Sequence, residues 1–407
     1  MEFPLKIVIT GASGYVGENI VPILESQCTA LLLIGRDVAK LARMFPDVPN
    51  CSFDEMSKYA QDFDAILHLA VLNNNAQVDD ADFRNINVTL TTQTANMAAA
   101  CGIKKFYNIS SIHVLDDQNQ SPYAKSKREA VSSLVKVSGI DVTNVYLPFV
   151  RGEEWHGKLG FLDNLPLFLT KPLESWLFAL KPSVDAKRLA HFVLQPTVPR
   201  DWVILSEGQA NNSAYKMMKR GMDLLFAVVV FALLWWLLFI IWALIRLGSP
   251  GPGIFAQERV GLNGKTFTCY KFRTMRVGTV QAGSHEVSQA SVTSIGRFLR
   301  RTKLDELPQV WNIIKNDISL IGPRPGLPMQ RELFVKRLAR GVFNVKPGIS
   351  GLAQVNNVDM SDPSTLAAWD ARYVSLQSII LDVKIALATA RGRGQGDKTG
   401  PNKFTKK

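Results

Sequence analysis

Residues 6–17 read Lys6-Ile7-Val8-Ile9-Thr10-Gly11-Ala12-Ser13-Gly14-Tyr15-Val16-Gly17, and a helical pattern follows them as far as Leu24. The first five form a β-branched run that is typical of a strand. Glycines at 11, 14 and 17 permit a tight turn, close approach of the backbone to a pyrophosphate, and close packing of helix on strand. The GxxGxxG spacing alone is weak evidence, but its place between a strand and a helix predicts a dinucleotide-binding turn.

The remainder of the first half alternates strands with helices. Further strands are expected at Ala30 to Ile34, Ala65 to Ala70 and Lys105 to Ser110, with helical patterns at about 85–101 and 123–138 between them. This order predicts an α/β fold over residues 1–210, a Rossmann-like doubly wound parallel sheet with ligands at the carboxyl ends of its strands. The N-terminus shows no basic region and cleavage site of a signal peptide, so this half is expected to stay cytoplasmic.

These residues resemble the extended short-chain dehydrogenase/reductase family, which includes nucleotide-sugar epimerases, dehydratases and reductases. The resemblance covers about residues 5–210 and rests on the glycine turn and on His68-Leu69-Ala70, Asn87, Ser110-Ser111 and Tyr123-Ala124-Lys125-Ser126-Lys127. It implies that Tyr123 is the acid/base, that Lys127 and the cofactor ribose lower the tyrosine pKa, and that Ser111 positions the substrate oxygen. Ser110 is an alternative to Ser111. The cofactor would contact Gly11, Ala12, Ser13, Gly14, Tyr15, Gly17 and Ala70.

Two local departures from the family pattern bear on which cofactor is bound and which reaction is catalysed. The second strand ends in Arg36, and the nearest acid, Asp37, comes only after it, which favours NADP over NAD. Ile112-His113 stands where dehydratases of the family have Asp-Glu, which disfavours a 4,6-dehydratase. Only 67 residues, 149–215, lie between Pro148 and the helix predicted below over residues 216–248, so a ketosugar reductase is preferred to an epimerase. A noncatalytic module that binds cofactor or sugar is a further alternative.

Charge and hydropathy change sharply after residue 210. Residues 1–210 carry 19 basic and 23 acidic side chains, a net of −4, whereas residues 211–407 carry 28 and 12, a net of +16. From Leu224 to Ile245, 22 consecutive residues include no charge, Gly or Pro. At about 1.5 Å per residue such a helix is long enough to cross a bilayer core. The basic half is therefore expected to meet a membrane and phosphorylated substrates, and no nucleic acid.

The membrane helix is predicted over residues 216–248. The parts on either side both need cytoplasmic ligands, so a re-entrant helix that enters and leaves the same leaflet is favoured over a spanning one. Trp235-Trp236 occupies its middle, with no Pro or polar break at the expected bend. The four cysteines are widely separated and lack metal-ligand spacing.

A pair of adjacent acids marks the second half. Lys303-Leu304-Asp305-Glu306-Leu307-Pro308 is followed by Ile321-Gly322-Pro323-Arg324-Pro325. Between Gln257 and Gly351, sixteen Lys and Arg stand against six Asp and Glu. Two carboxylates in such a field are expected to stay ionised, to hold a divalent cation and to act on a phosphate.

The second half resembles the bacterial sugar transferase family, the monotopic phosphoglycosyl transferases, over about residues 216–390. The resemblance rests on the acid pair and on the runs at 254–261, 267–275, 294–301, 316–325 and 345–356. It implies transfer of a sugar 1-phosphate from a UDP-sugar to polyprenyl (undecaprenyl) phosphate. Asp305 would attack the sugar-linked phosphate, and Glu306 would bind Mg²⁺. Arg324 would bind phosphate or the nucleotide, with Lys271, Arg273 and Arg301 as further phosphate ligands.

Together these patterns predict a bifunctional enzyme of glycoconjugate assembly at the cytoplasmic face of a bacterial inner membrane. Its transferase domain is expected at 249–390, followed by a disordered basic tail at 391–407 that touches membrane lipid. A homodimer is possible. Asn357-Val358 replaces the Gly-Arg that usually follows Val-Asn in the family, so the sugar is left open.

Overall fold

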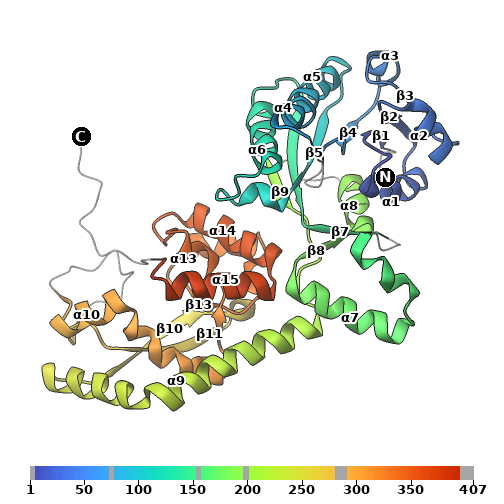
Figure 1. The fold of residues 1–407 in the computed structure, drawn as a ribbon. Coiled ribbons are helices and arrows are strands. Elements are labelled where there is room, and N and C mark those ends of the chain that lie inside the picture. Colours follow the sequence, from blue (N-terminus) through green and yellow to red (C-terminus); the bar gives the residue numbers. More distant parts are fainter. Residues whose placement is uncertain (1–4, 73–77, 153–156, 196–200, 280–290, 395–407) are drawn as a thin grey trace, which may run out of the picture. The chain divides into compact units, whose positions relative to one another are not determined.

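The structure is a computed structural model that describes residues 5–72, 78–152, 157–195, 201–279 and 291–394 (Figure 1). The chain divides into two compact units. Unit 1 comprises Met1–Thr170 and Pro182–Glu207, and unit 2 comprises Lys171–Lys181 and Gly208–Lys407. Most of the tail predicted to be disordered, from residue 395 on, lies outside the described residues.

Unit 1 is built on a seven-stranded parallel sheet in the order β3-β2-β1-β4-β5-β6-β9. Its strands are β1 (Lys6–Thr10), β2 (Ala30–Ile34), β3 (Asn50–Cys51), β4 (Ala65–His68), β5 (Lys105–Ser111), β6 (Asp141–Leu147) and β9 (Trp202–Ile204). Strands β1, β2 and β3 follow one another toward one edge of the sheet, and strands β4, β5, β6 and β9 follow one another toward the other edge. The strand order therefore reverses between β1 and β4, where doubly wound sheets bind their ligands. The predicted fold class is confirmed.

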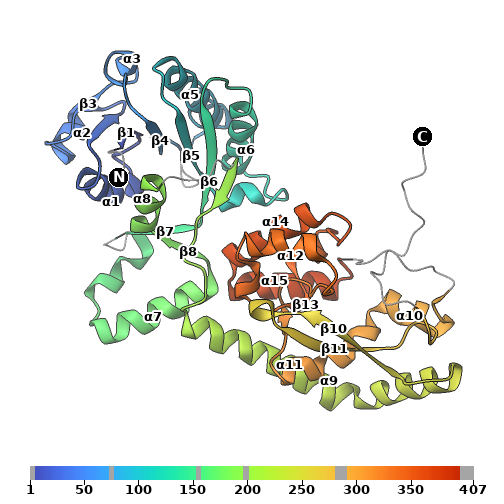
Figure 2. The ribbon, with the colours of Figure 1, turned by 180° about the vertical axis from the view of Figure 1, so that it is seen from behind.

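Helices cover both faces of this sheet (Figures 1 and 2). Ile7 and Ile9 of β1 pack into one core with α1, α2 and α8, while Val8 between them packs into the other core with α3, α5 and α6. This alternation follows from the two-residue period of a strand buried on both faces. The helical elements are α1 (Tyr15–Glu25), α2 (Val38–Met44), α3 (Met56–Tyr59), α4 (Asp80–Arg84), the π-helix η1 (Asn85–Leu90), α5 (Thr91–Ala100), η2 (Ile112–Leu115), α6 (Pro122–Leu134), η3 (Gly157–Asn164) and α8 (Ala186–Leu194). A separate parallel pair joins β7 (Phe149–Arg151) to β8 (Ser183–Asp185).

Unit 2 begins with one long helix and continues with short elements packed along it. After α9 (Ser213–Gly248) come the antiparallel strands β10 (Ile254–Val260) and β11 (Thr266–Phe272). The parallel pair β12 (Ser319–Ile321) and β13 (Gly348–Ser350) forms a second small sheet. The helices are α10 (Ser294–Thr302), η6 (Leu304–Gln309), α11 (Val310–Ile314), α12 (Arg331–Leu338), α13 (Leu352–Val355), α14 (Pro363–Leu376) and α15 (Ile379–Ala390), with single turns at η4 (Leu262–Gly264) and η7 (Val342–Asn344).

One side of α9 is buried against the rest of unit 2 from end to end. Ala227 and Val230 pack with α11, and Ile241 and Ile245 pack with β11 and α10. Its other side is apolar and exposed, as at Leu225 (65%). Only 17% of its most apolar 18-residue window is buried, whereas the core helix of a soluble protein would be mostly buried. Among the described residues, α9 alone is long and apolar enough to cross a membrane.

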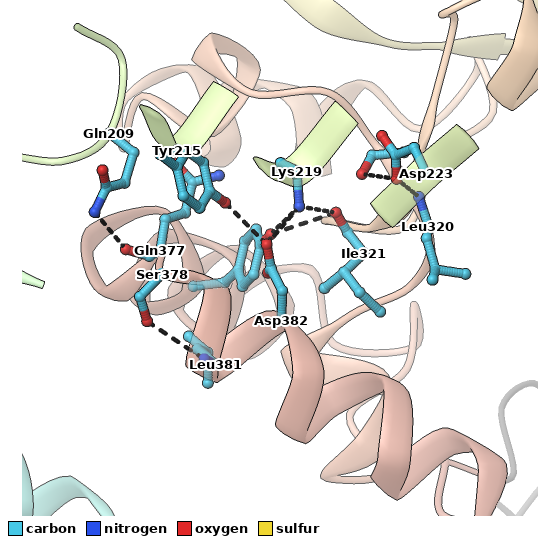
Figure 3. Close-up of polar contacts among 12 residues, drawn as sticks. Gln209, Tyr215, Lys219, Asp223, Leu320, Ile321, Gln377, Ser378, Leu381 and Asp382 are labelled. Atoms are coloured by element: carbon cyan, nitrogen blue, oxygen red, sulfur yellow. Dashed lines mark hydrogen bonds and ion pairs between the residues drawn. The ribbon is translucent and has the colours of Figure 1, made fainter. Parts of the chain in front are cut away.

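Polar contacts fix the first turns of α9 in unit 2 (Figure 3). Lys219 Nζ donates to Asp382 Oδ2 on α15 (2.7 Å) and to the Ile321 carbonyl on β12 (3.0 Å). Tyr215 Oη donates to the same carboxylate oxygen (3.0 Å). Asp223 Oδ1 accepts the Leu320 amide (2.7 Å). These charges would be costly in lipid, so their partners hold the start of α9 in the protein.

Helix α7 (Leu167–Leu180) lies well before residue 210, where the sequence places the domain boundary, yet residues 171–181 belong to unit 2. Ala179 packs with Ala214 and Tyr215 of α9. Ser175 Oγ donates to Asn212 Oδ1 (2.9 Å), and Asn212 Nδ2 returns a bond to the Ser175 carbonyl (3.0 Å). Such contacts join residues far apart in sequence, so a boundary drawn from composition misses them.

Candidate active sites

The acid pair of unit 2 sits directly after a tight turn at Lys303. This residue ends α10 in the left-handed region (φ 58°, ψ 14°), a conformation that costs a non-glycine residue roughly 1 kcal/mol or more. The short helix η6 then begins, with Asp305 and Glu306 in its first turn. The turn therefore places the two carboxylates beside strand β11.

Glu306 is held by two cations. Its Oε1 accepts Lys271 Nζ from β11 (2.7 Å) and Arg324 Nη1 from the loop after β12 (3.1 Å). Burial alone would raise the pKa of Glu306, but Lys271 and Arg324 outweigh it and lower the pKa to about 2. Glu306 is therefore ionised at neutral pH. Its carboxylate links β11 to the loop after β12, which are distant in sequence.

Asp305 is placed differently from its neighbour. Among the described residues its carboxylate has no hydrogen bond or ion pair. Burial and the negative charge of Glu306 raise the pKa of Asp305 to about 6, with Lys271, Arg300 and Arg324 opposing them. Environment thus separates two chemically similar groups: Glu306 is hydrogen-bonded and anionic, whereas Asp305 has no hydrogen bond in the described part of the chain and is more basic.

The predicted phosphate ligands fall into two groups. Lys271 and Arg324 meet at the acid pair. Arg273 does not: its guanidinium is buried and donates to the carbonyls of Ser249 (2.8 Å) and Pro250 (2.7 Å), which ties down the end of α9. Its Nη1 and Nη2 serve this packing in the structure, and a role of Arg273 in binding phosphate stays a prediction. Arg301 is exposed on α10, and no contact joins it to the acid pair in the described part of the chain.

Two arginines that the sequence interpretation passed over support the same site. Arg300 donates from Nε to Thr274 Oγ1 (3.0 Å) and lies close enough to lower the pKa of Asp305. Arg259 Nη1 donates to the Pro325 carbonyl (3.0 Å), one residue after Arg324. The only sequence signal for Arg300 was its place beside Arg301 in a basic run.

The donor set at the pair is compatible with Mg²⁺. Both protein contacts to Glu306 fall on Oε1, which leaves Oε2 and the Asp305 carboxylate without a hydrogen bond in the described part of the chain. Mg²⁺ is commonly bound by one or two carboxylates together with substrate phosphates and water. The described residues contain no group of three or more His, Cys, Asp or Glu side chains, so most ligands would have to come from substrate and water.

The glycine turn of unit 1 has the shape of a dinucleotide site. Gly11 has φ +73°, and a Cβ there would lie 2.5 Å from the Ala70 amide nitrogen. A Cβ on Gly17 would lie 2.3 Å from the Ala12 carbonyl oxygen. A Cβ on Gly14 would meet only the Gly11 carbonyl oxygen, at 3.5 Å. Two glycines therefore permit close packing, while Gly14 leaves open backbone at the start of α1 for a pyrophosphate.

The other predicted contacts of the turn differ in exposure. Ala12 is buried, whereas Ser13 and Ala70 are half-buried beside the open glycine. The Tyr15 hydroxyl accepts the Gly152 amide (2.8 Å). Arg36 is exposed just after β2. Lys40, which the sequence interpretation did not select, reaches the Ser13 carbonyl from α2 (3.4 Å) and brings a second cation to the turn.

Ser111, Tyr123 and Lys127 come together at the end of β5 and the start of α6. The Ser111 side chain hydrogen-bonds Tyr123 and lowers its pKa, but burial outweighs this and leaves the pKa raised. Lys127 is buried and donates to the Ile109 carbonyl (3.0 Å), and burial lowers its pKa to about 7. Burial therefore outweighs the Ser111 hydrogen bond in setting the tyrosine pKa, and Lys127 donates to the backbone.

Buried polar residues form hydrogen bonds next to Ser111, Tyr123 and Lys127. Asn87, in the π-helix η1, accepts the Leu72 amide (2.8 Å) and donates to Ser126 Oγ (3.1 Å). His68 lies between Thr10 and Thr91, and burial followed by the charge of Lys127 lowers its pKa to about 3. A neutral histidine with both ring nitrogens occupied orients its neighbours and does not exchange protons at neutral pH.

Unit 1 combines a dinucleotide-type sheet with an assembled Ser, Tyr and Lys, and unit 2 combines an acid pair with a long apolar helix, as expected of an enzyme. The chain belongs to the bacterial sugar transferase family, which matches residues 214–394. Residues 7–158 match the NAD dependent epimerase/dehydratase family. Both resemblances drawn from the sequence are thus confirmed.

Named relatives agree with this assignment of the second half. EpsL, an uncharacterized sugar transferase of Bacillus subtilis, is 38% identical over 175 residues, 43% of this chain and 86% of its own length. The Aeromonas hydrophila UDP-N-acetylgalactosamine-undecaprenyl-phosphate N-acetylgalactosaminephosphotransferase is 39% identical over 188 residues, 44% of each chain. The Escherichia coli UDP-glucose:undecaprenyl-phosphate glucose-1-phosphate transferase is 36% identical, over 43% of this chain and 39% of its own. The chain thus spans less than half the length of the latter two.

Among solved structures, WbmG of Bordetella bronchiseptica in complex with NAD is 17% identical to this chain. The alignment covers 50% of this chain and 73% of that one, with a TM-score of 0.40. A similarity at this level is no basis for assigning an activity.

Proposed function

We propose that unit 2 transfers a sugar 1-phosphate from a UDP-sugar to undecaprenyl phosphate through a covalent intermediate on Asp305. The observation that carries this is the difference between the two acids. Glu306 is fixed by Lys271 and Arg324, whereas Asp305 has no hydrogen bond or ion pair among the described residues and has a raised pKa. A nucleophile needs a free lone pair and enough basicity, and Asp305 has both.

The proposed reaction has two balanced steps. An Asp305 carboxylate oxygen attacks the sugar-linked phosphorus, the bond from that phosphorus to the bridging oxygen breaks, and UMP leaves with the electron pair. An oxygen of undecaprenyl phosphate then attacks the acyl phosphate, and the Asp305 carboxylate leaves to give the sugar diphospholipid. Covalent catalysis in this form avoids bringing the two anionic substrates together at once.

Lys271 and Arg324 carry the positive charge that the diphosphate needs. Both lie on Glu306 Oε1, so the carboxylate positions them beside Asp305. Arg324 can offer a planar fork to phosphate oxygens, whereas Lys271 acts as a point charge. Mg²⁺, held by Glu306 Oε2 and substrate oxygens, would neutralise the diphosphate and activate the leaving group.

The test is a transfer assay with the full chain in membranes. Radiolabelled UDP-N-acetylgalactosamine and UDP-glucose are the first donors to try, because the names of the relatives specify them. Product should require undecaprenyl phosphate and Mg²⁺, and UMP should be released in equal amount. Absence of lipid-linked label with every UDP-sugar would contradict the proposal.

We further propose that α9 is membrane-inserted with both ends on the cytoplasmic face. The helix has no break in its backbone from Ser213 to Gly248, although it bends part of the way along (Figures 1 and 2). Lys219 near its start and Ile245 near its end both pack on the same unit. A spanning helix would carry the partners of one end into lipid, where their polar groups would be costly.

Labelling of single cysteines at the two flanks tests this topology. With Met217→Cys and Leu247→Cys variants in sealed inverted membrane vesicles, both cysteines should react with an impermeant maleimide. Both positions are exposed in the described structure, at 59% and 86%. Reaction of one flank only, with the second reacting after detergent is added, would show a spanning helix.

For unit 1 we propose reduction of a ketosugar by NADPH or NADH, with Tyr123 as the proton donor. The support is the assembly of Tyr123, Ser111 and Lys127 near the open glycine turn. An epimerase is the second candidate, favoured by the name of the family that residues 7–158 match. A reductase consumes one reduced cofactor for each sugar, whereas an epimerase regenerates its cofactor. Absorbance at the reduced nicotinamide band separates the two.

NADPH is the cofactor we propose, because Arg36 is exposed beside the glycine turn and Lys40 adds a second cation. The Arg36→Ala variant should lose about tenfold to a hundredfold in kcat/KM for NADPH, the range expected for one charged phosphate contact, with little change for NADH. Arg43→Ala, which removes an exposed arginine of the next helix, is the matched control. Equal losses with both cofactors would argue against a phosphate contact at Arg36.

A further inference from the structure

Helix α7 carries an apolar stripe on its exposed side. Leu169, Leu173 and Trp176 are 48%, 37% and 42% exposed. Their spacing of four and three residues puts them on one face of the helix. Phe168, at 74% exposure, adjoins the stripe. Four large apolar side chains on one short helix are more than the isolated exposed residues that any soluble protein shows.

Another face of α7 is occupied by protein. Ala179 is buried against Ala214 and Tyr215 of α9. Gln209 Nε2 donates to the Phe178 carbonyl (2.7 Å), and the same nitrogen donates to the Gln377 carbonyl before α15 (3.1 Å). The part of α7 from residue 171 on is thus fixed in unit 2, at the start of the apolar helix.

The part of α7 that carries Leu173 and Trp176 packs against the start of α9, through Ala179 with Ala214 and Tyr215 and through Ser175 with Asn212. Farther along α9, Leu225 is 65% exposed. Lys171 and Lys181, which flank Leu173 and Trp176 in the sequence, and Lys216 of α9 are exposed as well. Apolar and tryptophan side chains bordered by lysines suit the interface of an anionic bilayer.

We infer that α7 is a second lipid-contacting helix, which lies in the membrane interface beside the first turns of α9. The occupant is the headgroup and upper acyl region of a bilayer that contains anionic lipid. The inference rests on the proposed membrane attachment of α9. According to this inference, α7 also contacts lipid, although it precedes the apolar helix and the sequence assigns it to the nucleotide-binding half.

The experiment places an environment-sensitive fluorophore on Leu173→Cys in the full chain, reconstituted in phosphatidylcholine and phosphatidylglycerol vesicles. Val228→Cys of α9 is the membrane reference, and Val135→Cys of unit 1 is the aqueous reference; these positions are 62% and 80% exposed. Burial raises the pKa of all four native thiols, at Cys28, Cys51, Cys101 and Cys269. Because the thiolate is the reactive form, introduced exposed cysteines should label faster.

The expected result is a blue shift and a severalfold emission gain at Leu173, with quenching by nitroxide-labelled lipid, as at Val228 and unlike Val135. Quenching of the Leu173 probe by aqueous iodide only, while the Val228 probe stays in lipid, would overturn the α7 inference and leave the attachment of α9 intact. Aqueous behaviour of both probes would overturn both proposals. Shielding of Leu173 from both quenchers would indicate contact with a second protein copy and overturn lipid binding.

Discussion

The Asp305→Asn variant should lose transfer of sugar phosphate to lipid by on the order of 10³-fold or more, the scale seen when a covalent nucleophile is removed. An amide has nearly the same size as the carboxylate but cannot form the acyl phosphate. The fold should tolerate it, because Asp305 has no hydrogen bond or ion pair among the described residues. The measurement is lipid-linked radiolabel formed from a UDP-sugar, with UMP release followed in parallel.

A matched control removes another carboxylate of unit 2. Glu332→Gln acts on an exposed acid whose ion pair with Lys336 lies within one helix, so activity should stay near that of the unchanged protein. If Asp305→Asn forms product at the rate of this control, Asp305 is not the nucleophile. Retained UMP release without lipid product would instead indicate hydrolysis by water.

The same assignment fixes the sign of the pH dependence. Burial and Glu306 raise the pKa of Asp305 to about 6, above the ordinary range of an aspartate. The protonated acid cannot attack phosphorus, so the rate of UMP release in a single turnover should fall as pH drops through about 6. An ordinary surface aspartate would keep its activity down to about pH 4. A pH profile that is flat between 5 and 8 would contradict Asp305 as the attacking group.

Local periodicity was sufficient to predict four strands of the sheet in unit 1. Strands β1, β2, β4 and β5 were expected close to their observed places, because β-branched runs beside glycine turns have few alternatives. The position of α7 was not predictable, since it depends on pairs such as Ser175 with Asn212 that no local pattern reveals. The contacts of both ends of α9 with one unit are likewise tertiary and invisible in a hydropathy pattern.

Which side chains meet at the acid pair was predictable only in part. Motif order brought Asp305, Glu306, Lys271 and Arg324 into one hypothesis, and the structure brings these four residues together. Arg273 belongs to the same run as Lys271, yet its side chain turns to Ser249 and Pro250. Neighbours on a strand point to opposite faces, so residues two apart share a side only while the strand continues. Because β11 ends at Phe272, Arg273 lies outside the strand and its side chain need not lie on the same side as that of Lys271.

The Tyr123→Phe variant should lose ketosugar turnover by about 10²- to 10⁴-fold, the usual contribution of a positioned acid or base. The ring remains, so cofactor binding and the packing against Phe83 should persist. The measurement is NADPH oxidation with a 4-keto UDP-sugar, together with mass spectrometry of the lipid product with and without NADPH. Transfer itself should be unchanged, because Asp305 lies in the other unit.

Tyr59→Phe, which alters a 46% exposed tyrosine of unit 1, is the matched control. Unchanged ketosugar turnover in Tyr123→Phe would show that Tyr123 is not the proton donor. Absence of turnover in the unchanged protein, with cofactor still bound, would make unit 1 a binding module for cofactor or sugar.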